Sequence, residues 1–300
     1  MRLRVPFRAM AAEHEIVVDH DDPDGARTAV AAAIADVQRI EAKFSRYRDD
    51  SVTSAIARAA GGPPVAIDDE TAALLAYADA CHVLSGGAFD VTSGVLRRAW
   101  DFRARPPRLP SQDEIDALLP KVGWTRVERT PASVRLPEPG MELDFGGIGK
   151  EYAADRAAGV LAQHGIRHAL VNLGGDLRAI GAQGGGRPWR IGIRNPRPVH
   201  GAPAAIAAVA LADAALATSG DYERGFEIAG VRYAHILDAR TGWPVSHWQS
   251  ISVVAPLAVV AGSCATLAVL AGARAAAFLR EQGVDWLGID AGGTRHGTLG

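Results

Sequence analysis

The sequence predicts an α+β fold. Its 300 residues include 48% hydrophobic and 22% charged residues, an ordinary globular composition for a chain long enough to bury a large core. Helical patterns gather in the first half, whereas strand patterns follow one another from residue 133 without regular helices between them. That order favours an α+β domain over a doubly wound parallel sheet. Because the sequence has no internal repeat and no long linker, residues 1–300 are predicted to form one domain.

Two helices are predicted in the first ninety residues. The first covers residues 26–44, where apolar residues at helical spacing make one stripe for a core. The stripe consists of Val30, Ile34, Val37, Ile40 and Phe44. The second follows Asp68 and Asp69, either of which can cap it, and ends at Gly86 and Gly87.

A short helix and a series of strands follow. Ser111 and Glu114 have the spacing of a capping box, which predicts a helix up to Leu119. Strands are predicted from alternating or apolar runs bounded by Gly, Pro, Asn or Asp. These runs are SVRL, MELDF, HALVNLGGDLRAIGA, RPWRIGIRN, AIAAVAL, GFEIAGVRYAHILD and QSISVVA. Ala229 and Gly230 are predicted to form the turn of a hairpin.

Charge, cysteine content and hydropathy exclude several classes of protein. A formal net charge of −2 offers no basic surface for nucleic acid. Cys81 and Cys264 are too few and too far apart for a disulfide framework and are predicted to be buried small hydrophobic residues. The N-terminus lacks the apolar region of a secretory signal or a lipid-accepting cysteine, so a cytoplasmic location is expected. Residues 251–273 are long enough to span a membrane, but Pro256 divides them into a core strand and a core helix.

A glycine-rich turn in LDFGGIGKEYAADRAAGVLAQHG is the first candidate for chemistry. A strand is predicted to stop at Phe145, and a helix to run from about Lys150 to His164. The free N–H groups at such a helix start, together with Lys150, would bind a phosphate. Lysine occurs only at positions 43, 121 and 150, so a lysine here stands out in an arginine-rich chain. The alternative is a tight strand-to-helix turn with a solvated lysine.

Four further segments surround this turn in order along the chain. They are FSRYRDDSVTSA, GGAFDVTSGVLRRAW, LVNLGGDLRAIG and ATSGDYERGFEIAGVRYAHILDARTGWPV. With the glycine turn, they resemble the ApbE family of FAD:protein FMN transferases. The resemblance extends from about Met10 to near Gly272, which is almost the whole chain.

The resemblance implies a two-lobed α+β fold with mixed or antiparallel sheets, flanking helices and FAD in a cleft between the lobes. It also implies a magnesium-dependent transfer of FMN from FAD to a threonine hydroxyl, with release of AMP. The acceptor would be a protein that bears a DxxTGAT-type motif. Attack of a neutral hydroxyl on a pyrophosphate needs charge neutralisation, positioning and a base, so a metal, a cationic or N–H-rich turn, and a histidine or carboxylate suit this chemistry.

The resemblance assigns candidate roles to individual residues. Those implied to contact FAD are Met10, Tyr47, Ala88, Phe89, Asp90, Asp144, Lys150, His235 and Ile236. Among these, His235 and Lys150 are the candidate catalytic residues, with His235 as acid or base near the phosphates. The alternatives are structural: Phe89 and Ile236 as core residues, Asp90 as a turn residue and His235 as a strand histidine.

The predicted metal site departs from the family pattern. The family places an aspartate four residues before a threonine on one helix face, but AGSCATLAVL has Gly262 before Thr266, and Ala265 at the position of a second acid. Glu151 stands where the family turn has glycine. The metal ligands are therefore expected to be Glu151, Thr266 and the carbonyl of Gly147. The alternative for Glu151 is a first-turn glutamate that favours the helix dipole and faces water.

A weakened metal site leaves other functions open. One alternative is an FAD pyrophosphatase that uses water as the acceptor. Another is a non-catalytic flavin-binding protein, because a hard cation without a carboxylate ligand binds weakly.

Overall fold

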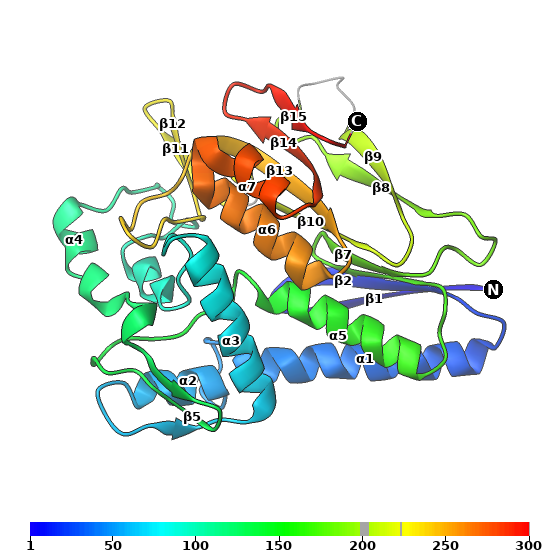
Figure 1. Cartoon of the computed structure of the whole chain (residues 1–300), viewed down its shortest axis with the longest axis horizontal. Coiled ribbons are helices and arrows are strands. Elements are labelled where there is room, and N and C mark those ends of the chain that lie inside the picture. The colour runs from blue at the N-terminus through cyan, green and yellow to red at the C-terminus, as the bar shows by residue number, and fades with distance from the viewer. Residues whose placement is uncertain (199–203, 223, 300) are drawn as a thin grey trace.

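The computed structural model describes residues 1–198, 204–222 and 224–299. Its centre is an eight-stranded sheet in the order β1-β2-β6-β7-β10-β13-β14-β15, and every neighbouring pair in it is antiparallel (Figure 1). The strands are β1 (Arg2–Ala9), β2 (Ala12–Asp19), β6 (Ala169–Leu173), β7 (Asp176–Ile180), β10 (Ala215–Gly220), β13 (Trp248–Ala255), β14 (Asp285–Asp290) and β15 (Arg295–Gly297). The α+β prediction is confirmed.

Helices cover one face of this sheet and a hairpin covers the other. The covering helices are α1 (Pro23–Phe44), α5 (Gly149–Gln163), α6 (Ala258–Ala271) and α7 (Ala275–Glu281). The hairpin consists of β8 (Trp189–Arg194) and β9 (Ala205–Leu211). Side chains alternate along a strand, so Ile16 and Val18 of β2 join the core under the helices while Val17 joins the core under the hairpin.

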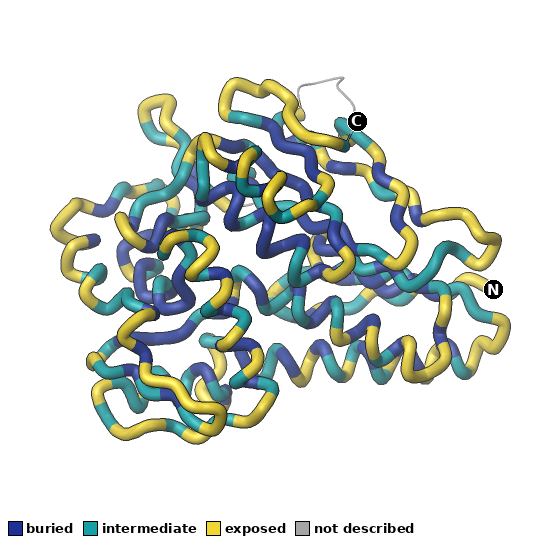
Figure 2. The backbone as a smooth tube through the Cα atoms, in the orientation of Figure 1, coloured by how far each residue is buried: buried dark blue, intermediate teal, exposed yellow. Residues whose placement is uncertain are grey.

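A smaller, mainly helical lobe lies beside the sheet lobe (Figure 1). It contains α2 (Val52–Arg58), α3 (Asp69–Leu84), α4 (Gln112–Asp116) and a small sheet of β3 (Val65–Ala66), β4 (Glu128–Thr130) and β5 (Ser133–Arg135). Short 3-10 helices at Ser93–Arg98, Leu119–Lys121 and Trp124–Arg126 complete it. A separate hairpin, β11 (Gly225–Ile228) with β12 (Val231–Ala234), ends in an exposed tip (Figure 2).

Local sequence signals account for several boundaries. The Asp68 side chain accepts a hydrogen bond from the Thr71 N–H and caps α3, and Ser111 with Glu114 forms the predicted capping box. That helix ends at Asp116 rather than Leu119 and is followed by a 3-10 turn. Ala229 and Gly230 have φ of 51° and 76°, as a type I′ hairpin turn requires.

One strand prediction was wrong, and one pair of strands went unpredicted. The run MELDF forms no strand, because residues 141–145 are irregular chain leading into α5. The N-terminal hairpin β1–β2 went unpredicted, although Arg2 to Ala9 alternate between exposed and less exposed positions. The alternation of Arg2, Leu3, Arg4 and Val5 is itself the pattern of a half-buried strand, so the sequence did carry this signal.

The apolar C-terminal segment forms the predicted core strand and core helix. Residues Ala258–Glu281 are long and apolar enough to cross a membrane by length and composition, yet 61% of the most apolar window is buried within the protein. Strand β13 precedes the helix, and α6 packs on β10 and β13. Cys81 and Cys264 are both buried free thiols, as predicted.

Candidate active site

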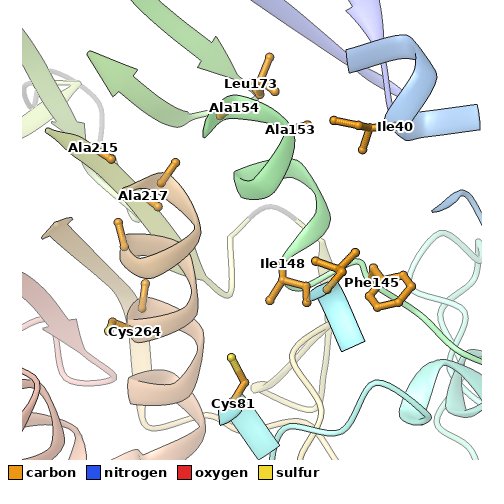
Figure 3. Packing of buried hydrophobic residues seen from close by; sticks show 14 of the residues in the cluster. Ile40, Cys81, Phe145, Ile148, Ala153, Ala154, Leu173, Ala215, Ala217 and Cys264 are labelled. Carbon is orange, nitrogen blue, oxygen red and sulfur yellow. The ribbon is translucent and has the colours of Figure 1, made fainter. Parts of the chain in front are cut away.

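The glycine turn joins irregular chain to the start of α5 where the two lobes meet. The Asp144 carboxylate accepts a hydrogen bond of 2.9 Å from the Gly146 N–H, and the Phe145 carbonyl accepts one of 2.7 Å from the Gly149 N–H. Phe145 and Ile148 anchor the turn in the core (Figure 3). A Cβ on Gly147 would lie 2.9 Å from the Phe89 ring, so only glycine fits against the helical lobe there.

The start of α5 is suited to an anion. Ile148 occupies the N-cap position, and within the described chain no side chain caps this helix. Uncapped first-turn N–H groups carry the positive end of the helix dipole and bind phosphate groups well.

Lys150 forms an ion pair with Asp176, the first residue of β7. Burial alone would lower the pKa of Lys150, but the Glu151 and Asp176 carboxylates outweigh burial and raise it. The lysine is therefore charged and paired across the fold, while 33% of its side chain stays exposed to solvent. Asp176 belongs to the LVNLGGDLRAIG segment, in which no residue was predicted to act in the site.

Asp144 and Tyr47 meet through Arg46. The Arg46 guanidinium forms an ion pair with Asp144, donates a hydrogen bond of 2.7 Å to the Tyr47 hydroxyl and lies 4.9 Å from the Tyr47 ring centre. The Tyr47 residue is 77% exposed, an unusual fraction for an aromatic side chain that is fixed by an arginine. An exposed, oriented ring beside the glycine turn provides a stacking surface for a planar ligand.

His235 lies just beyond β12. Its Nδ1 is 3.2 Å from the Arg224 carbonyl oxygen, and since a carbonyl only accepts, Nδ1 carries the proton. In the neutral ring this leaves Nε2 free to accept a proton. Burial lowers the pKa of His235, and the charges of Arg224 and Lys150 lower it further, so the ring is neutral at neutral pH.

The GAFD segment packs against the turn, but its residues differ in their roles. Asp90 is 6% exposed, and its two carboxylate oxygens accept from the Thr92 N–H and hydroxyl and from the Trp124 N–H. The carboxylate thus shapes its own loop, as the turn-residue alternative describes. Phe89 is half-buried against the main core and faces Gly147, while Ala88 is buried.

Met10 lies at the β1–β2 turn, and Ile236 follows β12. The Met10 N–H donates a hydrogen bond of 2.7 Å to the Glu41 carboxylate, and Met10 has a φ of 49° at the β1–β2 turn. Both side chains are partly buried on the main core. Their contact with FAD stays a prediction.

Glu151 does not face water, so that alternative is wrong. The residue is 6% exposed, and its Oε2 atom has no hydrogen-bond partner among the described residues. Burial raises the pKa of Glu151 to about 7, and the nearby Asp176 carboxylate adds to the rise. The side chain lies against α6, where a Cβ on Gly262 would come within 2.5 Å of the Glu151 Cγ. The paired sequence departures at 151 and 262 are therefore in contact.

The hydroxyl of Thr266 on α6 is an oxygen donor of the kind that suits a hard cation. Thr266 follows Gly262 by one helical turn, and its hydroxyl is 2.7 Å from the Ser219 hydroxyl on β10. Within the described ranges no group of three or more His, Cys, Asp or Glu side chains is placed to hold a metal. A cation here would need ligands from a bound substrate, as magnesium sites beside phosphates do.

Several site residues lay inside the recognised segments without being assigned a role. They are Arg46, Asp176, Ser219 and Arg224. Their contacts with residues distant in sequence identify them. The spacing of neighbouring residues does not. His14 lies outside the motif segments, and no sequence pattern marks it. It is 4% exposed on β2, and neither ring nitrogen has a hydrogen-bond partner in the described chain.

Comparison with known proteins identifies the family. The model of the ApbE family matches residues 10–288. The chain belongs to the ApbE family. An FAD:protein FMN transferase of Treponema pallidum is 35% identical over 282 residues, covering 87% of this chain and 77% of that protein. The FAD:protein FMN transferase of Escherichia coli K12 is 31% identical, covering 80% and 70%.

Solved structures of ApbE proteins share the whole fold. The crystal structure of the Thermotoga maritima ApbE protein matches with a TM-score of 0.90 at 33% identity, covering 99% of this chain and 97% of that one. The apo form of the Pseudomonas stutzeri flavinyl transferase ApbE matches with a TM-score of 0.87 at 26% identity, covering 99% and 95%. The two-lobed ApbE fold expected from sequence is confirmed.

Proposed function

We propose that this protein is an FAD:protein FMN transferase, which moves FMN from FAD to a threonine hydroxyl of an acceptor protein and releases AMP. One observation carries the proposal: the uncapped, glycine-rich start of α5 holds Lys150, which forms an ion pair with Asp176 of β7. Family membership and the names of the relatives support the same activity.

The reaction is a phosphoryl-group substitution without redox change. The threonine oxygen bonds to the FMN phosphorus, and the bond from that phosphorus to the bridging oxygen breaks. The bridging oxygen leaves with AMP, while the threonine proton passes to a base. We assign that base to Nε2 of His235, because Nδ1 is held by the Arg224 carbonyl.

The remaining side chains hold charge and position. Lys150, fixed by Asp176, neutralises charge on the pyrophosphate, and the first-turn N–H groups of α5 add to this effect. Tyr47 and Phe89 offer surfaces for the isoalloxazine ring. A magnesium ion bound by oxygen donors between α5 and α6 would neutralise further phosphate charge.

A direct assay tests the proposal. The purified chain is incubated with FAD and magnesium, with and without an acceptor domain that bears a DxxTGAT motif. We expect AMP and an equal amount of covalent flavin on the acceptor, and neither with an acceptor in which the threonine is valine. AMP without covalent flavin would indicate a pyrophosphatase instead. FAD binding without AMP would indicate a flavin-binding protein.

A further inference from the structure

The carboxylate of Glu151 is buried, and one of its oxygens has no hydrogen-bond partner among the described residues. Glu151 and Asp176 are both at least nine-tenths buried, and Lys150, the cation coupled to both, forms its ion pair with Asp176. The Oε2 atom of Glu151 has no partner in the part of the chain that the structure describes. Burying a carboxylate without a partner is costly, so such a group takes up a proton unless something else binds it.

The opposite helix provides the space for this carboxylate. A Cβ on Gly262 would lie 2.5, 2.9 and 3.0 Å from Cγ, Oε1 and Cδ of Glu151. The Glu151 side chain therefore occupies the volume into which a side chain at 262 would project. An aspartate at 262 would direct its carboxylate into the same region from α6, so it would have to displace the Glu151 side chain from its present position.

A second oxygen donor, Thr266, lies on α6, the helix of Gly262. Thr266 is one turn beyond Gly262 and half-buried, and its hydroxyl is fixed by Ser219 at 2.7 Å. A carboxylate and a hydroxyl are hard oxygen ligands of the kind that Mg²⁺ and Mn²⁺ prefer. The uncapped start of α5 at the same place is suited to phosphate oxygens, which would complete the coordination.

We propose that Glu151 is the carboxylate ligand of a divalent cation held between α5 and α6 together with Thr266 and substrate phosphate, and that Gly262 is its steric complement. The acid that binds the cation thus comes from α5 instead of α6. This proposal rests on the proposed function, since the phosphate ligands come from FAD.

Binding of Mn²⁺ tests the ligand without relying on activity. Free Mn²⁺ is measured by electron paramagnetic resonance during titration of the full chain in the presence of ADP, which supplies a pyrophosphate but no FMN. We expect the natural chain to bind Mn²⁺ and Glu151→Gln to weaken binding by at least about tenfold. Glu70→Gln is the matched control, because Glu70 anchors α5 through Tyr152 but pairs with Arg39 and Lys43. It should bind Mn²⁺ as the natural chain does.

Exchanging the two positions tests the steric part. Glu151→Gly alone should bind Mn²⁺ as weakly as Glu151→Gln, whereas Glu151→Gly with Gly262→Asp should recover most of the affinity. Gly262→Asp in the natural chain should lower the melting temperature, because its side chain collides with Glu151. A double variant that stays as weak as Glu151→Gly, while keeping its melting temperature, would overturn the steric exchange.

The outcomes separate this proposal from the proposed function. If the natural chain binds no Mn²⁺ with ADP, or Glu151→Gln binds it equally well, Glu151 is not a ligand even if FMN transfer proceeds. If Mn²⁺ binding depends on Glu151 but no FMN reaches an acceptor, the cation site stands and the proposed function fails.

Discussion

At the scale of single residues, Lys150 and Glu151 show how adjacent side chains acquire different environments. Lys150 reaches back to Asp176 on β7, whereas Glu151 packs against Gly262 on α6. Successive helical positions are separated by about 100° around the axis, so neighbours in sequence face different elements. Lys150 is paired within the fold, whereas Glu151 keeps one carboxylate oxygen without a partner among the described residues.

Asp144 is predicted to support FAD binding through Arg46 and the glycine turn. Asp144→Ala removes both the Arg46 ion pair and the hydrogen bond to the Gly146 N–H, so FAD affinity should fall by roughly tenfold or more. FAD titration followed by fluorescence measures the loss. Asp50→Ala removes an exposed carboxylate paired with Arg48 and serves as control. Equal FAD affinity in Asp144→Ala and the natural chain would exclude this role.

His235 is predicted to act as a base, so turnover should fall as the pH becomes acidic. His235→Gln should retain FAD but lose roughly two to four orders of magnitude in turnover. Because burial lowers the pKa of His235, the natural chain should keep its activity at neutral pH and lose it as pH falls through a value below the usual 6.5. Initial rates of AMP release against pH measure both effects, with the exposed His164→Gln as control. Unchanged turnover in His235→Gln would make it a structural histidine.

At the scale of elements, Glu70 joins three helices. From the start of α3 its carboxylate accepts hydrogen bonds from Arg39 and Lys43 of α1 and from Tyr152 of α5. The hydrogen bond from Arg39 is the largest cause that lowers the pKa of Glu70, to about 2. These hydrogen bonds connect the helical lobe to the helices that cover the sheet.

The hydrogen bonds to the Glu70 carboxylate predict a pH-dependent contribution to stability. A depressed folded-state pKa stabilises the fold above the unfolded value of 4.5, and the contribution is lost as pH falls from about 4.5 to about 2. Glu70→Gln should therefore lower the free energy of unfolding by about 1–2 kcal/mol at pH 7, allowing for solvent screening. Urea unfolding at pH 7 and at pH 3 measures the difference, which should shrink at pH 3. Glu13→Gln, on an exposed side chain, should change neither value; a Glu70→Gln loss of equal size at both pH values would contradict the argument.

At the scale of the whole molecule, the predicted FAD site draws residues from both lobes. Phe89 and Tyr47 come from the helical lobe and its border, while Lys150 and Asp176 belong to the sheet lobe. A ligand that contacts both lobes stabilises only the folded chain. Binding should therefore be visible as a shift in global unfolding.

FAD is predicted to raise the melting temperature of the protein. At a concentration of about 100 times Kd, a ligand adds about 2.7 kcal/mol to the free energy of unfolding, which corresponds to roughly 5 °C for a chain of this size. Calorimetry with FAD, riboflavin and AMP measures the shift. We expect FAD to exceed either fragment at equal concentration, because it bridges both parts of the site. An equal shift from AMP alone would place the binding energy away from Tyr47 and Phe89.

Local sequence patterns and the order of the motifs were enough to predict the fold class, the main helices and the segments that make up the candidate site. Helix stripes, caps and the turn at Ala229 and Gly230 are local, and their periodicity and backbone preferences are written in neighbouring residues. The sequence alone could not determine that MELDF forms no strand, because an apolar run is a strand only where a partner pairs with it. Tertiary structure alone decided that Asp176 holds Lys150 and that Glu151 is buried against Gly262. Those contacts join residues 26 and 111 positions apart, and their charge and packing depend on elements brought together only by folding.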